Sequence, residues 1–176
     1  MKATLFALFV FSFSLWGAEP KVVSRDKLQF REKGGRKLAY LPNQENPFTG
    51  KVVDFHPNGQ KILEGNYKNG KVNGLWTAWL KNGQKSREEN YKDGKPDGLR
   101  TLWWKNGQKR YERNYRDGKL ISEVVWKLNG EKCPVTNIDE DGNGVVVSYN
   151  EDGTESYRIT YKDGIPTAVN IQRPTP

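Results

Sequence analysis

A tandem repeat of 24 residues constrains this chain more than any other feature. Three segments align without a gap: GKVVDFHPNGQKILEGNYKNGKVN from Gly50, GLWTAWLKNGQKSREENYKDGKPD from Gly74 and GLRTLWWKNGQKRYERNYRDGKLI from Gly98. Two weaker copies follow, with turn glycines at Gly130 and Gly153. A repeat this short cannot bury an apolar face alone, so neighbouring copies are expected to stack into one continuous structure.

Each copy is predicted to be a β-hairpin, because short runs of β-forming residues flank an Asn-Gly or a similar turn. We expect a three-residue loop whose glycine takes a left-handed conformation in a G1 bulge. With a two-residue turn, the apolar residues of segment 145–149 would share a face with Arg158. The longer loop would put them with Tyr157, Ile159 and Tyr161 instead, and burial favours that register.

The predicted fold class is all-β: an elongated, twisted antiparallel meander of tandem hairpins, with about ten strands in one sheet. An aromatic residue stands four positions before each turn glycine, and a tyrosine stands eight positions after four of the five. These two columns are Phe55, Trp79, Trp103, Trp126 and Tyr149, and Tyr67, Tyr91, Tyr115 and Tyr161, with Ile138 in the fourth copy. We expect both columns on one face as an aromatic ladder. The other face would be more polar and would carry Arg100, Trp104 and the Glu64, Glu88 and Glu112 column.

The flanking segments give the domain boundaries. Residues 1–18 (MKATLFALFVFSFSLWGA) contain a lysine, then an apolar run, then the small residues Gly17-Ala18 at the predicted cleavage site. This order is typical of a secretory signal peptide, and an uncleaved N-terminal anchor is the alternative. We expect a linker over 19–29, a degenerate capping hairpin over 30–49, five repeats over 50–166 and a tail over 167–176. The predicted location is therefore outside the cytoplasm, periplasmic or secreted.

Composition narrows the class of partner. The formal net charge is +8, with lysine and glutamate interspersed rather than in blocks. This balance is compatible with an acidic protein, an anionic membrane surface or an acidic envelope polymer, or with simple solubility. Cys133 is the only cysteine, so no intramolecular disulfide can form, and it is expected to be a buried structural thiol rather than an intermolecular bridge.

Catalytic and cofactor chemistry has weak support in the sequence. His56 is the only histidine and lies at a turn, which argues against a metal site or a catalytic triad. The glutamate column recurs with Lys61, Lys85 and Lys109, so we expect cross-strand ion pairs on a solvated face. No helix pattern follows the glycines, which excludes a phosphate loop. We expect no enzyme activity and no cofactor.

One acidic turn resembles part of a calcium-binding loop in sequence. Asp139, Asp141 and Asn143 alternate before Gly144, as in the first half of an EF-hand. The twelfth position is Asn150 rather than the bidentate glutamate, and strand residues follow the glycine. An acidic turn is the preferred interpretation, and a weak calcium site is the alternative.

The aromatic ladder is the candidate binding surface. Its proposed members are Trp76, Trp79, Tyr91, Trp103, Trp104 and Tyr115. Exposed aromatic rings flanked by lysine and arginine suit a protein partner first, with an anionic membrane surface or envelope polymer as further possibilities, and nucleic acid is not expected. The alternative is that these rings only hold a single-layer sheet together.

The segment GLWTAWLKNGQKSREENYKDGKPDG resembles the MORN-repeat variant found in bacterial proteins, often classed as antitoxin-type MORN-repeat proteins. PFTGKVVDFHPNGQK, residues 47–61, resembles the opening repeat of that family, and the likeness covers roughly residues 30–165. It implies a hairpin-repeat sheet, attachment to proteins or membranes, and no catalytic residues. Lys127–Asn143 departs from the pattern, with Pro134 in the second strand. A second hypothesis is an antitoxin or immunity protein that neutralises a partner toxin.

Overall fold

The computed structural model describes residues 21–171, and the predicted signal peptide lies outside them. The described chain is almost entirely β, with one short 3-10 helix, η1 (Arg25–Lys27). None of its helices is long and apolar enough to span a membrane. The prediction of an all-β fold built from tandem hairpins is confirmed.

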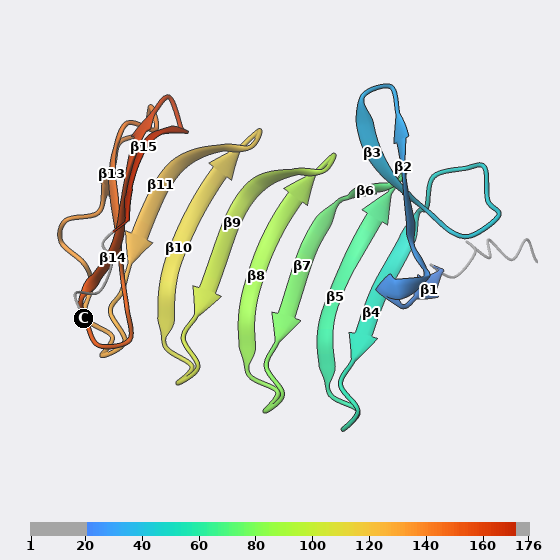
Figure 1. The fold of residues 1–176 in the computed structure, drawn as a ribbon, viewed down its shortest axis with the longest axis horizontal. Coiled ribbons are helices and arrows are strands. Elements are labelled where there is room, and N and C mark those ends of the chain that lie inside the picture. Colours follow the sequence, from blue (N-terminus) through green and yellow to red (C-terminus); the bar gives the residue numbers. More distant parts are fainter. Residues whose placement is uncertain (1–20, 172–176) are drawn as a thin grey trace, which may run out of the picture.

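A nine-stranded sheet forms the body of the molecule. Its strands are β1 (Val22–Val23), β4 (Gly50–Phe55), β5 (Lys61–Lys68), β6 (Lys71–Val72), β7 (Gly74–Trp79), β8 (Lys85–Lys92), β9 (Lys95–Trp103), β10 (Lys109–Arg116) and β11 (Lys119–Val125). From β4 onward neighbours pair antiparallel in chain order, and the short β6 also pairs antiparallel with β5. Strand β1 pairs parallel with β4. Figure 1 shows a single curved layer with hairpin loops along one edge and inter-repeat turns along the other.

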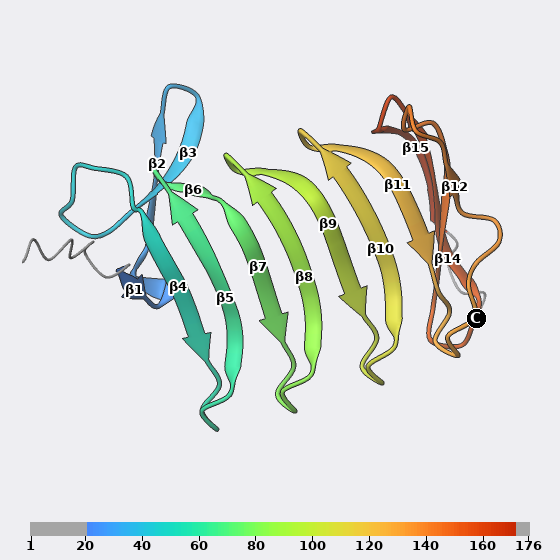
Figure 2. The same cartoon turned by 180° about the vertical axis from the view of Figure 1, so that it is seen from behind.

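Two smaller sheets stand at the ends of this row, as both views show (Figures 1 and 2). The capping hairpin β2 (Gln29–Lys33) and β3 (Arg36–Tyr40) turns at Gly34-Gly35, as predicted. The other sheet contains β12 (Asn137–Ile138), β13 (Gly144–Tyr149), β14 (Glu155–Lys162) and β15 (Ile165–Ile171).

The prediction of one continuous sheet is wrong at the fourth repeat. After β11 the chain makes only an isolated bridge between Trp126 and Lys132 before Pro134. Proline lacks the N–H that a ladder needs, so the second strand of this hairpin does not form. The predicted tail also begins too early, because β15 continues to Ile171.

The hairpin loops have the predicted geometry. Gly59, Gly83, Gly107, Gly130 and Gly153 have φ between 82° and 86°. In the second repeat, the N–H of Gly83 donates to the carbonyl oxygen of Leu80 at 2.9 Å, and the N–H of Leu80 donates to that of Gln84 at 2.8 Å. This pattern closes a three-residue loop with glycine at the left-handed position.

A second bulge, one residue pair beyond each loop, overturns the predicted faces. Trp79 pairs with Lys85, but Ala78 pairs with Arg87, so Ser86 is an extra residue in its strand. The same shift occurs in the first, third and fifth repeats. In the fifth repeat, Val147 consequently pairs with Arg158 rather than sharing a face with the tyrosines. A one-residue shift moves every later side chain to the opposite face.

The two aromatic columns therefore lie on opposite faces of the sheet. The tyrosine face carries Tyr67, Tyr91 and Tyr115, and the tryptophan face carries Trp79, Trp103 and Trp126. The residues assigned to a polar face are also divided: Glu64, Glu88 and Glu112 lie on the tryptophan face, and Arg100 lies on the tyrosine face.

Both hydrophobic clusters include residues of the tyrosine face, one at each end. The N-terminal cluster is Leu28, Ala39, Phe48, Val52, Leu63, Tyr67 and Trp76. The C-terminal cluster is Tyr111, Leu120, Val125, Cys133, Val146 and Val147. The caps thus cover the two ends of this face and leave its middle repeats less covered.

Candidate binding surface

The six residues predicted as one binding platform occupy three places. Trp79 and Trp103 lie half-buried on the tryptophan face, whereas Trp76, Tyr91 and Tyr115 lie on the tyrosine face. Trp104 directly follows β9, the first strand of the third hairpin, and is 6% exposed. The continuous ladder that the sequence predicted therefore does not exist.

Lysines connect the repeats on the tryptophan face. Lys61 Nζ lies 5.5 Å from the centroid of the Trp79 ring in the next repeat, and Lys109 Nζ lies 5.7 Å from that of Trp126. Such cation–π contacts add modest stability at exposed sites. They give the tryptophans of this face a role between repeats, which favours the structural alternative for this column.

The glutamate column is matched by lysines. Lys85 Nζ lies 2.5 Å from Glu88, and Lys109 Nζ lies the same distance from Glu112. These predicted ion pairs form, but along one strand rather than across strands; Lys51 and Glu64, 2.7 Å apart, make a cross-strand pair. Hydrogen bonds from Lys51 and Lys61 lower the pKa of Glu64. The glutamates of this column therefore form surface ion pairs, and they are not arranged as the two carboxylates of a general acid–base catalyst.

Trp104 is held by its own neighbours. Its Nε1 donates a hydrogen bond to the carbonyl oxygen of Trp126 at 3.3 Å, and the Arg110 guanidinium lies 4.4 Å from its ring centroid. Because one side of the ring and its polar atom are both engaged, Trp104 fits a structural role better than a binding role.

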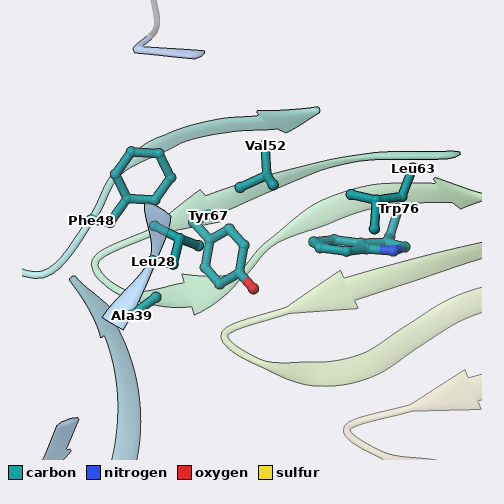
Figure 3. Packing of buried hydrophobic residues seen from close by; sticks show 7 residues of the cluster. All are labelled: Leu28, Ala39, Phe48, Val52, Leu63, Tyr67 and Trp76. Carbon is teal, nitrogen blue, oxygen red and sulfur yellow. The ribbon is translucent and has the colours of Figure 1, made fainter. Parts of the chain in front are cut away.

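A row of aromatic rings crosses the N-terminal half of the tyrosine face. Phe48, Tyr67 and Trp76 follow one another, with neighbouring ring centroids 5.9 Å apart (Figure 3). The Tyr67 and Trp76 rings meet edge to face at 78°. Trp76 also lies directly against Gly65, where an added Cβ would stand 1.9 Å from its ring.

A hollow of about 190 Å³ opens beside this row. Its walls are Arg25, Tyr67, Val72, Trp76, Arg87 and Tyr91. Arg25 comes from the segment predicted as a linker, and only Trp76 and Tyr91 were among the predicted site residues. Aromatic rings next to arginines are the composition most enriched in the energetic centres of protein interfaces.

Buried ion pairs continue the same face into the next repeats. Glu89 and Arg100 are cross-strand partners with 3.4 Å between Oε1 and a guanidinium nitrogen, and Arg113 and Glu123 are partners at 2.8 Å. The Glu89 and Glu123 side chains are 3% and 1% exposed. Burial raises the pKa of Glu123, and Arg113 opposes only part of that effect.

Glu89 and Arg100 occupy the positions that Gly65 and Trp76 occupy one repeat earlier. Arg113 and Glu123 form the corresponding contact one repeat later. Each contact joins the second strand of one hairpin to the first strand of the next. Sequence reasoning missed them because it placed Arg100 on the wrong face. The available signal was the opposite charges at Glu89 and Arg100, eleven residues apart, and at Arg113 and Glu123, ten apart.

The alkaline titration of Tyr91 gives a test of this face. Burial, followed by the negative charge of Glu89, raises the pKa of Tyr91 to about 12. A free tyrosine has a pKa of about 10, so unfolded chains ionise first and the fold loses stability between about pH 10 and pH 12. We expect Tyr91→Phe to have one fewer tyrosine that ionises near pH 12, as measured by ultraviolet absorbance. Its stability should also fall less steeply over that interval. An identical loss in both proteins would contradict this environment for Tyr91.

The remaining sequence candidates lie in structural settings. Asp139 Oδ1 accepts the N–H groups of Asp141 at 3.1 Å and Asn143 at 2.8 Å, so the acidic turn is closed by its own backbone. No cluster of three or more metal-ligating side chains occurs among residues 21–171. Cys133 is buried, and its thiol donates to the Tyr149 hydroxyl at 3.3 Å. The N–H of His56 closes the first hairpin loop onto Gln60.

Comparison with known families agrees with the repeat geometry. Residues 48–69, 72–93 and 96–117 match the family model described as MORN repeat variant, in three consecutive copies. No curated protein shows significant similarity to the chain. MORN repeats are scaffolds that mediate protein or membrane interactions, so the match supports a repeat protein involved in binding.

Proposed function

We propose that this chain is an exported, non-enzymatic repeat protein whose tyrosine face binds a partner protein. The observation that carries the proposal is the hollow where Tyr67, Trp76 and Tyr91 meet Arg25 and Arg87. A partner side chain inserted there would lose water on an aromatic surface and could carry a carboxylate to the arginines.

The rest of the face extends this anchor point. Tyr91 and Tyr115 are half-buried, so each presents part of its ring to solvent. A repeat array offers such chemistry along a line, so contact area grows with each copy. The tryptophan face is the weaker candidate, because its lysines already contact tryptophans of the next repeat and pair with glutamates.

A capture experiment with matched variants tests the choice of face. A tagged full chain is used to recover partners from an envelope extract, alongside Tyr91→Ala/Arg87→Ala and the tryptophan-face control Trp79→Ala/Trp103→Ala. We expect the first double variant to lose the partner at least tenfold and the control to retain it, with folding of both checked by circular dichroism. Retention by the first variant and loss by the control would overturn the assignment.

The same preparation tests the other parts of the proposal. Export rests on residues 1–18, so the mass of the chain recovered from the envelope should correspond to a start at Glu19. A tight one-to-one complex with a toxin encoded in the neighbouring reading frame would establish the antitoxin alternative. Sedimentation with anionic vesicles at low and high salt would identify membrane attachment instead.

A further inference from the structure

A second hollow lies on the edge of the sheet, away from the tyrosine face. It has a volume of about 670 Å³ and opens between the capping hairpin and the row of inter-repeat turns. Arg36 and Lys37 stand on the hairpin side, and Lys71, Lys92 and Lys95 stand on the turn side. We call this hollow the basic cleft. Figure 1 shows the β2–β3 hairpin rising beside the turns that follow β5 and β8.

The walls of the basic cleft are fixed by backbone hydrogen bonds. The N–H of Ala39, one residue after the cleft residue Leu38, donates to the carbonyl oxygen of Gly70 at 2.9 Å. Each turn is tied to the preceding one: the N–H of Gly94 donates to the carbonyl oxygen of Val72 at 2.9 Å. These hydrogen bonds join the hairpin wall to the turn wall, so the cleft is formed without a ligand.

The five cations of the cleft outnumber its carboxylates. Among residues 21–171, none of them takes part in a salt bridge, although lysines of the tryptophan face pair with glutamates. Two carboxylates, Asp93 and Asp117, also line the cleft, which leaves an excess of three positive charges. Like charges gathered in a concavity raise its potential and favour an anionic ligand.

We propose that the basic cleft binds an extended acidic peptide segment of a partner protein. This inference deepens the proposed function, since it too requires a protein partner, but it places the contact on a different surface. Asp93 and Asp117 would repel a uniform polyanion such as nucleic acid or a sulfated glycan. A peptide supplies N–H donors for these carboxylates as well as acids for the lysines. A concave site also excludes a flat bilayer surface.

The repeat spacing specifies the pattern of acids. Lys71 and Lys95 are equivalent residues of successive repeats, and they stand two strands apart, roughly 9–10 Å. A polyproline II segment advances about 3.1 Å per residue with three residues per turn, so every third side chain recurs on one side after about 9.3 Å. The recognised segment is thus an extended chain with a carboxylate at every third position.

Fluorescence anisotropy with synthetic peptides tests this directly. The full chain is titrated into a labelled (Glu-Ala-Pro)₃ peptide, which keeps backbone N–H donors between its prolines, and into a peptide of the same composition with its three glutamates adjacent. We expect at least fivefold tighter binding of the spaced peptide, and weakening of both with added salt. Equal affinity for the two peptides, or no binding of the spaced one, would overturn the proposal.

Charge-matched variants locate the site. Lys71→Glu/Lys95→Glu should weaken binding of the spaced peptide at least tenfold, whereas Lys81→Glu/Lys105→Glu, on the opposite loops, should not. Arg36→Glu/Lys37→Glu tests the hairpin wall at two exposed residues, so its outcome does not depend on the turns. If the cleft and control variants lose the same affinity for the peptide, binding depends only on the net charge of the chain, and the proposed site is refuted. Tyr91→Ala should bind the peptide normally, which separates this test from the tyrosine-face proposal.

Discussion

Replacing Gly65 with alanine is expected to destabilise the fold by about 3 kcal/mol, at the upper end of the usual cost of overpacking. The added Cβ would stand 1.9 Å from Cε3 and 2.5 Å from Cζ3 of Trp76. The indole is 7% exposed and meets Tyr67 edge to face, so moving it away from the new Cβ would disturb that contact. Urea denaturation followed by tryptophan fluorescence or circular dichroism measures the change.

A double-mutant cycle separates this clash from the general cost of replacing a glycine. In a Trp76→Ala background the ring is gone, and the same substitution at Gly65 should cost less than about 0.5 kcal/mol. Gly59→Ala serves as a second control, since nothing lies within 4 Å of its added Cβ and only the positive φ of 82° opposes it. If Gly65→Ala is equally costly with and without the Trp76 ring, the close packing of these two residues is refuted.

The repeat, its loops and the capping hairpin were predictable because their causes are local. Asn-Gly turns, a glycine at each loop and the Gly34-Gly35 dipeptide dictate backbone conformation within a few residues. The break after β11 was also signalled, because Pro134 cannot donate to a ladder. Copy number and spacing then follow from the sequence without knowledge of packing.

The faces were not predictable by the same reasoning. The second bulge at Ser86 depends on how two strands pair, and no turn residue marks it. One missed residue moved Tyr91 and Trp79 to opposite faces and hid the cross-repeat contacts of Glu89 and Arg100. Arg25 was missed for another reason: a segment that looks like a linker contributes a wall of the hollow.

Three solutions to one packing problem follow from the corrected faces. At equivalent positions between repeats, the chain places a ring on a glycine, then an acid against a base, then a base against an acid. The first is Gly65 with Trp76, the second is Glu89 with Arg100, and the third is Arg113 with Glu123. If these pairs are independent units, one should be able to replace another.

Glu89→Ala should cost about 2 kcal/mol, because it leaves the half-buried Arg100 guanidinium without its carboxylate partner. Glu89 is 2% exposed, and its carboxylate is the salt-bridge partner of both Arg87 and Arg100. The matched control is Glu88→Ala, which breaks the exposed pair with Lys85 on the other face and should cost less than about 1 kcal/mol. Equal losses from the two substitutions in urea denaturation would contradict a structural role for the buried pair.

Transplanting the first pair into the second position is the stronger form of this test. In Glu89→Gly/Arg100→Trp, the new indole would lie over a glycine with Tyr91 beside it, as Trp76 lies over Gly65 beside Tyr67. We expect each single substitution to cost at least about 2 kcal/mol and the double variant to lie within about 1 kcal/mol of the wild type. Additive losses would show that the contacts depend on their own repeats, and that the array is not modular at this interface.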